Sequence, residues 1–331
     1  MNTKSKVFEL LEKNKGESLS GAAIAQMLGI SRTGVWKAVS ALREDGYDIS
    51  SANKRGYALS ENSNVITHTS IQPYLQDKSI VSKIHLFKSV GSTNKIAKEM
   101  AINGCLHGTI IIADGQTQGQ GRYGRPFFSP QGDGLYMSFV LRPDILQFQN
   151  PALITASAAV AVCEAIEAVC GKSTTIKWVN DILLNGKKVC GILTEAMTDY
   201  ESGNVQWIVL GIGINIRHES FPDDIKSFAG SIYGNGAVGA KRSQLAAEII
   251  NRCLHIKSWE DDESIYNEYK KRSAVLGLNV TVVRPDETYP AKALDINKEG
   301  CLVVKKANGK VVAVHSGEVS VKIISKQVIS I

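Results

Sequence analysis

A glycine- and arginine-rich stretch near the middle of the chain has the residue types that bind anions. It spans residues 114–134 and reads DGQTQGQGRYGRPFFSPQGDG. Its glycines let backbone amides approach an anion closely, and Arg122 and Arg125 supply positive charge that matches phosphate or carboxylate. Phe127 and Phe128 offer apolar cover. We therefore expect a long loop without regular structure that orders over an anionic ligand.

Within this stretch, the segment GQGRYG at 119–124 matches the dinucleotide fingerprint G-x-G-x-x-G. That fingerprint needs a strand before it and a helix that starts on its third glycine. A strand is expected at 109–113, where TIIIA is apolar and β-branched. Pro126 and Pro130 follow in place of the helix. The dinucleotide interpretation therefore fails, and the loop must serve another ligand.

The elements that must position this loop alternate between strands and helices. We expect strands in residues 82–90, 109–113, 135–143, 174–179, 181–197 and 205–216, with a hairpin turn at Asn185-Gly186. We expect helices in residues 92–103, 151–170, 242–259 and 262–275, the third capped by Ser243. This pattern indicates an α+β domain around a mixed or antiparallel sheet, not a doubly wound fold.

The first sixty residues predict three short helices followed by a two-stranded hairpin. Ser20 and Ser31 are suited to cap the second and third helices, and Gly29 lies in the turn between them. Two helices joined by such a turn are typical of helix-turn-helix proteins. With the hairpin after them, the segment resembles a winged helix-turn-helix DNA-binding domain.

One face of the third helix, together with the hairpin tip, carries residue types that bind phosphates and base edges. The DNA-binding candidates are Ser31, Arg32, Thr33, Trp36, Lys37, Ser40, Lys54 and Arg55. We expect DNA binding because helix, turn and basic wing occur in the required order. The alternative is a small three-helix module that uses a basic face for protein contacts.

Composition places the chain among ordinary globular proteins. Its 331 residues are 44% hydrophobic and 21% charged, with a formal net charge of +6 that permits a nucleic-acid partner without requiring one. Six scattered cysteines without paired histidines argue against a zinc site or a disulfide framework and favour reduced, mostly buried thiols. We expect no apolar run of membrane-spanning length and see no signal peptide, which predicts a cytoplasmic protein without a membrane partner.

After residue 278 the sequence turns to short strands. We expect them at 279–284, 288–296, 301–306 and 311–324, separated by the turn sequences NKEG and ANGK. This composition predicts a small β-barrel at the end of the chain.

Four motifs together resemble the signatures of the biotin–protein ligase family. They are the loop sequence GQGRYGRPFFSPQGDGLYMS, KWVND at 177–181, KKVCGIL at 187–193 and GIGIN at 211–215. With the N-terminal segment, the whole chain resembles the bacterial members that are both ligases and repressors of biotin genes. The resemblance implies a multidomain α+β protein with a winged helix-turn-helix domain (1–62), a linker (63–80), a class II synthetase-like catalytic domain (81–273) and an SH3-like domain (274–331). A purely structural cap is the alternative for the last domain.

The family resemblance implies a reaction in two steps. Biotin and MgATP would form biotinyl-5′-AMP, and a lysine of a biotin carboxyl carrier protein would then take the biotin and release AMP. No metal site of the protein itself is expected, because Mg²⁺ would arrive with ATP. The same adenylate would act as corepressor, favouring a homodimer that binds operator DNA through two winged helices.

The resemblance also assigns roles residue by residue. The catalytic residues would be Arg122, Asp181 and Lys188, with Asp181 also orienting the incoming amine. The biotin-binding residues would be Ser92, Thr93, Asn94, Gln116, Gln120, Gly121, Arg122, Lys188, Gly211 and Gly213. The nucleotide-binding residues would be Arg122, Arg125, Phe127, Lys177, Asn180, Lys188 and Asn215.

Several of these positions keep structural alternatives. Lys177 and Lys187 could be ordinary charges at strand ends, and Ser92 and Thr93 form a natural helix cap. Gly211 and Gly213 could relieve crowding in a strand, and Asp181 could be a turn residue.

Two positions depart from the usual family pattern. Gln120 stands where the family loop often has arginine, which removes a side-chain charge and predicts weaker retention of the adenylate. Val179 replaces a frequent proline and removes no functional group. Two other functions stay open: a biotin-sensing transcription regulator without ligase activity, and a lipoate- or octanoate-protein ligase.

Overall fold

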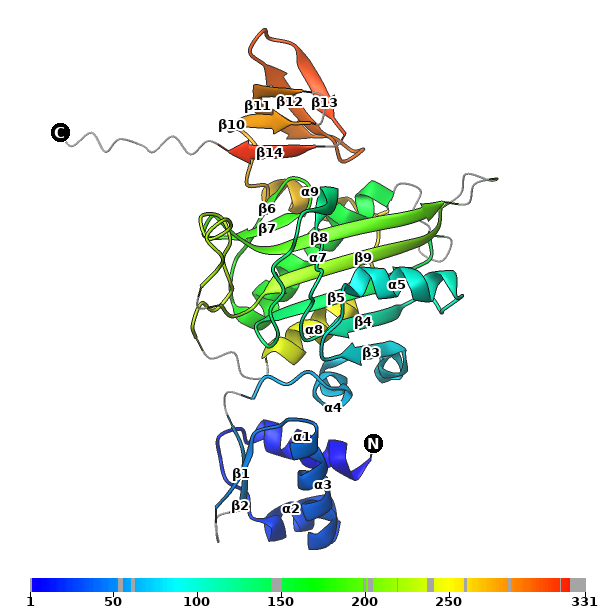
Figure 1. Cartoon of the computed structure of the whole chain (residues 1–331), viewed down its shortest axis with the longest axis vertical. Coiled ribbons are helices and arrows are strands. Elements are labelled where there is room, and N and C mark those ends of the chain that lie inside the picture. The colour runs from blue at the N-terminus through cyan, green and yellow to red at the C-terminus, as the bar shows by residue number, and fades with distance from the viewer. Residues whose placement is uncertain are drawn as a thin grey trace, which may run out of the picture.

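The protein is built from three bodies arranged along one long axis (Figure 1). The computed structural model describes residues 2–52, 56–60, 63–143, 151–198, 201, 205–218, 220–236, 241–258, 261–284, 287–315 and 317–321. The N-terminal helices lie at one end of the long axis, a large sheet with its helices lies in the middle, and a small sheet lies at the other end. This organisation confirms a multidomain α+β protein.

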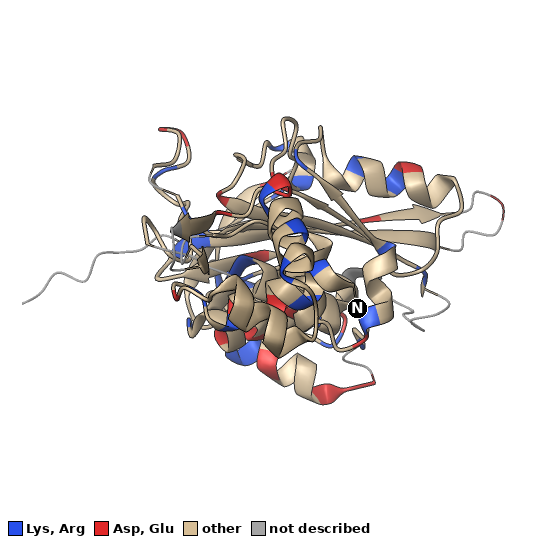
Figure 2. Ribbon diagram, turned by 90° about the horizontal axis from the view of Figure 1, so that it is seen from below, with Lys and Arg blue, Asp and Glu red and all other residues tan. Residues whose placement is uncertain are grey.

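The N-terminal body consists of α1 (Thr3–Lys13), α2 (Gly21–Leu28) and α3 (Arg32–Glu44), followed by β1 (Ile49–Ala52) paired antiparallel with β2 (Gly56–Leu59). The predicted caps are present: Ser20 accepts a hydrogen bond from the amide of Ala23, and Ser31 from that of Gly34. Gly29 ends α2 in the left-handed conformation that the turn requires. Figure 2 views this end and shows basic residues on the helices, interspersed with acidic ones.

The segment between this body and the large sheet is folded against the large sheet's helices. It contains α4 (His68–Ile71) and the short 3₁₀ turns Gln72–Tyr74 and Lys78–Lys83. Ile71, Leu75 and Ile80 are buried in the main hydrophobic core. We expected a polar linker here, and these three apolar side chains are what ties it down.

The central sheet is mixed, as expected. Its strands, in spatial order, are β3 (Ile84–Phe87), β4 (Thr109–Ala113), β5 (Gly134–Leu141), β9 (Val205–Asn215), β8 (Lys187–Thr198), β7 (Asp181–Leu184) and β6 (Thr175–Lys177). Only β3 and β4 run parallel among these pairs of described strands. The turn at Asn185-Gly186 joins β7 to β8, with both residues at positive φ.

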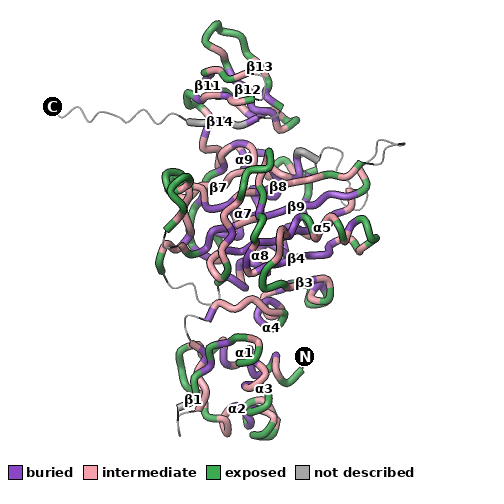
Figure 3. The backbone as a smooth tube through the Cα atoms, viewed as in Figure 1, coloured by how far each residue is buried: buried purple, intermediate pink, exposed green. Residues whose placement is uncertain are grey.

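Helices cover the two faces of the sheet unequally. One face packs against α7 (Pro151–Cys170), α8 (Lys241–Cys253) and α9 (Glu263–Lys271), and Figure 3 shows this interior as mostly buried. The other face carries α5 (Thr93–Ile102), whose Ala97 and Ala101 pack on Val140 and Val209. The remainder of that second face is left for the glycine-rich loop.

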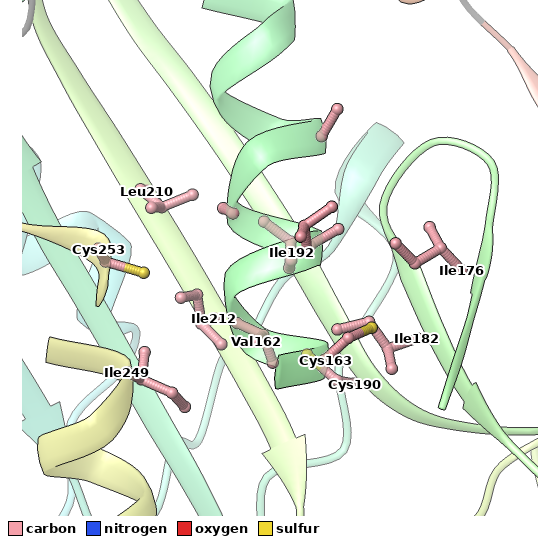
Figure 4. Packing of buried hydrophobic residues seen from close by; sticks show 14 of the residues in the cluster. Val162, Cys163, Ile176, Ile182, Cys190, Ile192, Leu210, Ile212, Ile249 and Cys253 are labelled. Atoms are coloured by element: carbon pink, nitrogen blue, oxygen red, sulfur yellow. The ribbon is translucent and has the colours of Figure 1, made fainter. Parts of the chain in front are cut away.

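Alternation of side chains along β9 and the adjacent residues 190–193 of β8 separates core from site. Cys190, Ile192, Leu210 and Ile212 point toward α7 and are fully buried (Figure 4). The residues between them, including the glycines of GIGIN, therefore face the opposite side. The two-residue alternation of side chains thus places apolar residues in the core on one face of the sheet and glycines on the other face.

One expectation about α7 was wrong. Its stretch Leu153–Cys170 is long and apolar enough to cross a membrane, yet 72% of that stretch is buried inside the protein. The helix is apolar all round because the sheet and α8 and α9 surround it. It is thus the core helix of a folded domain.

The C-terminal body is a five-stranded antiparallel sheet. Its strands are β10 (Asn279–Val283), β11 (Thr288–Ile296), β12 (Leu302–Lys306), β13 (Val311–Val314) and β14 (Glu318–Val321), in the order β13-β12-β11-β10-β14. The run expected as one strand at 311–324 is thus two strands, on opposite edges of the sheet. Three residues connect them, so the sheet must curl until its edges approach one another.

Candidate functional site

The glycine-rich loop folds back on itself as an irregular ribbon over the open face of the sheet. Backbone hydrogen bonds join Gln116 to Ser129 and Gly119 to Phe127, and a short 3₁₀ turn forms at Arg122–Gly124. The expectation of a loop without regular structure was therefore too simple. Gly119 is required because a Cβ there would lie 2.6 Å from the Ser129 hydroxyl and 2.7 Å from the Phe127 carbonyl oxygen.

Beneath the loop lies a cavity of about 1070 Å³. Every residue that we expected to bind biotin or nucleotide, or to act in catalysis, lines this one cavity: Ser92, Thr93, Asn94, Gln116, Gln120, Gly121, Arg122, Arg125, Phe127, Lys177, Asn180, Asp181, Lys188, Gly211, Gly213 and Asn215. They come from α5, the loop, and strands β6 to β9, which are far apart in the chain. The sheet topology is what brings them together.

The floor is formed by glycines on neighbouring strands. Gly213 pairs with Gly191 across β9 and β8, and Gly211 pairs with Ser138 across β9 and β5. A Cβ on Gly211 would lie 2.1 Å from Asn94 Oδ1, and one on Gly213 would lie 2.7 Å from the Phe127 ring. These glycines therefore make room for specific side chains in the cavity.

A hydrogen-bonded polar cluster closes the end of the cavity beside α5. Gln116 Oε1 accepts from the Thr93 amide at 2.8 Å and from its hydroxyl at 3.1 Å, and Gln116 Nε2 donates to Ser129. Gln116 thus caps α5, whereas Ser92 makes no side-chain cap bond. The Ser138 hydroxyl lies 2.8 Å from Thr93 Oγ1 and 2.6 Å from Asn94 Oδ1. This end presents fixed donors and acceptors to a neutral polar group.

Charged groups gather at the other end. Lys188 Nζ pairs with Asp181 Oδ1 at 2.7 Å, and both side chains are about three-quarters covered. The Lys188 ammonium lies 6.0 Å from the centre of the Phe127 ring. Arg122 donates to the carbonyl oxygen of Gly317 at 3.1 Å and to Asn180 Oδ1 at 3.5 Å. A cationic junction thus lies between the polar end and the C-terminal body.

Other lining residues lay outside every motif in the sequence. The segment 221–229 contributes Phe221, Asp224, Ile225, Ser227, Phe228 and Ala229, and the C-terminal part of the chain contributes Leu278 and Val319. The segment is tied to the site because Asn215 Nδ2 donates to Gly230 and Lys188 bonds Phe228 and Gly230 through its backbone. Its sequence has no periodicity that could have indicated this position.

The stems of the loop are held by a buried arginine of α8. Arg242, 1% exposed, pairs with Asp114 Oδ1 at 2.6 Å and donates to the Gly134 carbonyl oxygen at 2.7 Å. These two residues are the first and last of the loop. Ser243, which we expected to cap α8, lies inside the helix, which begins at Lys241, and instead bonds Ser70 at 2.9 Å.

The candidate nucleic-acid surface is separate from this cavity. Ser31, Arg32, Thr33, Trp36 and Lys37 are exposed at the start of α3, and Ser40 is half-buried. Ser31 is occupied as the helix cap. Trp36 is 58% exposed, which is unusual for its size in a folded domain. Lys54 and Arg55 lie outside the described residues.

Comparison with known proteins agrees with this architecture. Family models match at residues 86–215 (biotin/lipoate A/B protein ligase family), 3–58 (HTH domain) and 275–322 (biotin protein ligase C terminal domain). The bifunctional ligase/repressor BirA of Bacillus spizizenii is 36% identical over 92% of this chain and 94% of its own length. The chain belongs to the biotin–protein ligase family.

More distant proteins are also similar to large parts of this chain. The bifunctional ligase/repressor BirA of Escherichia coli is 26% identical over 93% of this chain and 94% of its own length. A biotin protein ligase from Aquifex aeolicus, solved with biotin and ATP, is 27% identical and aligns with a TM-score of 0.62, covering 72% of this chain and 98% of that chain. Nearly three-quarters of this chain thus has a counterpart in a solved structure.

Proposed function

We propose that this protein is a cytoplasmic ligase that activates biotin with MgATP to biotinyl-5′-AMP and transfers it to a lysine of a biotin carboxyl carrier protein. The observation that carries the proposal is the single cavity with a neutral polar end at Thr93 and Gln116 and a cationic junction at Lys188. A neutral bicyclic head group, a carboxylate and a nucleotide need those surroundings in that order. Relatives named as ligase/repressors support the choice of ligand.

The chemistry explains why charge matters more than a nucleophile at this site. The biotin carboxylate is already nucleophilic, so no serine or cysteine has to be activated. The barrier is the approach of two anions, and Lys188 and Arg122 supply positive charge where the phosphorane develops. Lys188 is shared with Asp181 before ligand binds, which limits the cost of holding a lysine in a partly buried site.

Mg²⁺ belongs to this reaction as part of the substrate MgATP. Within the described residues, no group of three or more His, Cys, Asp and Glu side chains could hold a metal ion. The carboxylates of Asp181 and Asp224 do line the cavity. That donor set fits Mg²⁺, which proteins hold through one or two carboxylates together with substrate phosphates. The ion would help to neutralise charge on the phosphates.

The remaining cavity residues take roles from their positions. Ser92, Thr93, Asn94, Gln116, Gly211 and Gly213 surround the biotin head group, while Gln120, Gly121 and Arg122 cover the acyl chain. Arg125, Phe127, Lys177, Asn180 and Asn215 line the nucleotide side. When the adenylate has formed, the loop excludes water from the mixed anhydride. Asp181 then orients the amine of the carrier lysine.

The N-terminal body makes the same protein a repressor of biotin genes. With biotinyl-5′-AMP bound, the protein would form a homodimer and present two α3 helices to operator DNA with paired half-sites. The exposed basic face at the start of α3 supports this assignment. The curled five-stranded sheet supports an SH3-like C-terminal domain, which contributes Leu278 and Val319 to the nucleotide side.

One experiment tests the ligase directly. Purified protein is incubated with biotin, MgATP and a biotin carrier domain, and mass spectrometry detects biotin on the carrier lysine. Lys188→Ala should lose at least about a hundredfold in rate, because it removes a charge that stabilises the transition state. Lys172→Ala, which changes an exposed lysine outside the cavity, should match the wild type.

Other outcomes separate the competing functions. Biotinyl-5′-AMP that stays bound without transfer to the carrier would identify a sensor that is not a ligase. Transfer of lipoate or octanoate in place of biotin would identify the lipoate ligase branch. Absence of any adenylate from the wild type would overturn the assignment of this cavity.

A further inference from the structure

A carboxylate behind the polar end of the cavity decides which way an amide points. Asn94 Nδ2 donates to Glu195 Oε2 at 2.9 Å and to the Leu193 carbonyl oxygen at 3.4 Å. An ionised carboxylate only accepts hydrogen bonds, so the NH₂ group of Asn94 must face Glu195. Asn94 Oδ1 therefore faces the buried Ser138 hydroxyl, 2.6 Å away.

That orientation also determines what Asn94 offers to the neighbouring Ser138 hydroxyl. Ser138 has one hydroxyl proton and lies between Asn94 Oδ1 and Thr93 Oγ1. Thr93 in turn donates to Gln116 Oε1, which turns the Gln116 NH₂ group toward Ser129. A reversal of the Asn94 amide would turn its NH₂ group toward Ser138 and would place the amide oxygen against the Glu195 carboxylate, where two acceptors would face each other. The Thr93 amide fixes Gln116 by itself, whereas the acceptor that Asn94 presents beside Gly211 and Ser138 depends on Glu195.

Both oxygens of Glu195 are used. Lys98, one helical turn after Asn94, places its ammonium 3.0 Å from Glu195 Oε1. Glu195 thereby attaches α5 to β8 at two points, next to the helix end that carries Ser92 and Thr93. Glu195 itself is not among the cavity-lining residues.

We propose that Glu195 is a positioning residue that fixes the orientation of the Asn94 amide, and with it one hydrogen-bond acceptor, at the biotin head-group end. The inference rests on the proposed function, in which biotin occupies this end. The ureido ring of biotin has one carbonyl acceptor and two N–H donors, so it needs partners whose donors and acceptors are fixed. Lys98 holds the carboxylate of Glu195 in place.

The test compares variants of the full chain by calorimetric biotin binding and by steady-state kinetics. Glu195→Ala should raise the Kd and KM for biotin by about tenfold, while kcat at saturating biotin and the KM for ATP change by less than twofold. Glu195→Gln should fall between, because its amide oxygen still accepts from Asn94 but its NH₂ group faces Lys98. Glu99→Gln is the matched control, because Glu99 is an exposed glutamate on α5, the helix that carries Asn94 and Lys98.

Two results would overturn this inference. One is an unchanged biotin Kd in Glu195→Ala while the wild type binds biotin normally. The other is an equal loss in biotin KM, ATP KM and kcat together with a lower melting temperature, which would make Glu195 merely structural. Failure of the wild type itself to bind biotin would overturn the proposed function as well, so the two failures are distinguishable.

Discussion

His218, just after β9, packs against the glycine-rich loop (residues 114–134). Its ring stacks on Phe128 at 5.0 Å between centroids, with 15° between planes, and lies 4.6 Å from Phe221. Burial lowers the pKa of His218, and the carboxylate of Asp133, 3.6 Å away, partly offsets this effect. The stack therefore favours the neutral imidazole.

This gives a pH dependence with a definite sign. Because the folded-state pKa of His218 is below its unfolded value of about 6.5, its contribution to stability is complete above that pH and is lost as pH falls through the folded value. When the pH is lowered from 7.5 to 5.5, the melting temperature of His218→Gln should fall by less than that of the wild type. His255→Gln, at an exposed histidine, should follow the wild type. Equal acid sensitivity of all three proteins would contradict the prediction.

The sequence predicted the cationic and glycine residues of the site but not their polar supports. Arg122, Lys188 and Gly213 stand in recognisable motifs, so their place in the cavity could be inferred. Ser138 ends the first of these motifs but was given no role, and Glu195 lies outside all of them, because it reaches the site through strand register, which no local pattern encodes.

At the scale of elements, a residue of α8 holds both ends of the glycine-rich loop in place. Arg242 holds Asp114 and Gly134, the two ends of the loop, from a position with 1% exposure. Arg242 therefore fixes the two ends of the loop relative to each other, independently of the conformation of residues 119–127. Local sequence predicted α8 but placed its start at the wrong residue, since Ser243 looks like a cap and is instead part of the packing against Ser70.

Removing the arginine should therefore loosen the loop and destabilise the domain. Arg242→Met keeps most of the volume but leaves the Asp114 carboxylate without this partner, which should lower the free energy of unfolding by about 2–3 kcal/mol. Biotinyl-5′-AMP should also dissociate faster. Chemical denaturation and a chase experiment measure the two effects. In a double-mutant cycle with Asp114→Asn, strictly additive losses would show that the pair does not act together.

Across the whole molecule, the ligase cavity and the basic face of α3 lie on different bodies, so their activities should separate by mutation. Arg32→Ala with Lys37→Ala removes two exposed charges at the start of α3. On duplex DNA of random sequence, the slope of log affinity against log salt should become shallower by about 2, since each phosphate contact contributes about 0.9. Fluorescence anisotropy measures the slope, and ligase rates should stay at the wild-type value.

The matched control is Lys13→Ala, an exposed basic residue of α1. An unchanged salt slope in the double variant would assign the basic face to protein contacts. The three-body organisation itself could be read from the sequence, because each body has its own pattern of apolar residues. The packing of residues 63–83 on the central body could not, because the buried apolar side chains of this polar segment, Ile71, Leu75 and Ile80, follow no helix or strand period.

The segment between the bodies contacts both of them. The carbonyl oxygen of Ser63 accepts a hydrogen bond at 2.9 Å from Lys15, just after α1, and Thr67 bonds Tyr47 at 2.5 Å. The neighbouring Asn64 donates to the carbonyl oxygen of Gly132 in the glycine-rich loop at 3.4 Å. If the ligand bound under the loop changes the affinity for DNA through this segment, bound DNA must change the affinity for the ligand by the same coupling free energy. An operator fragment would then tighten adenylate binding by the same factor as the adenylate tightens DNA binding.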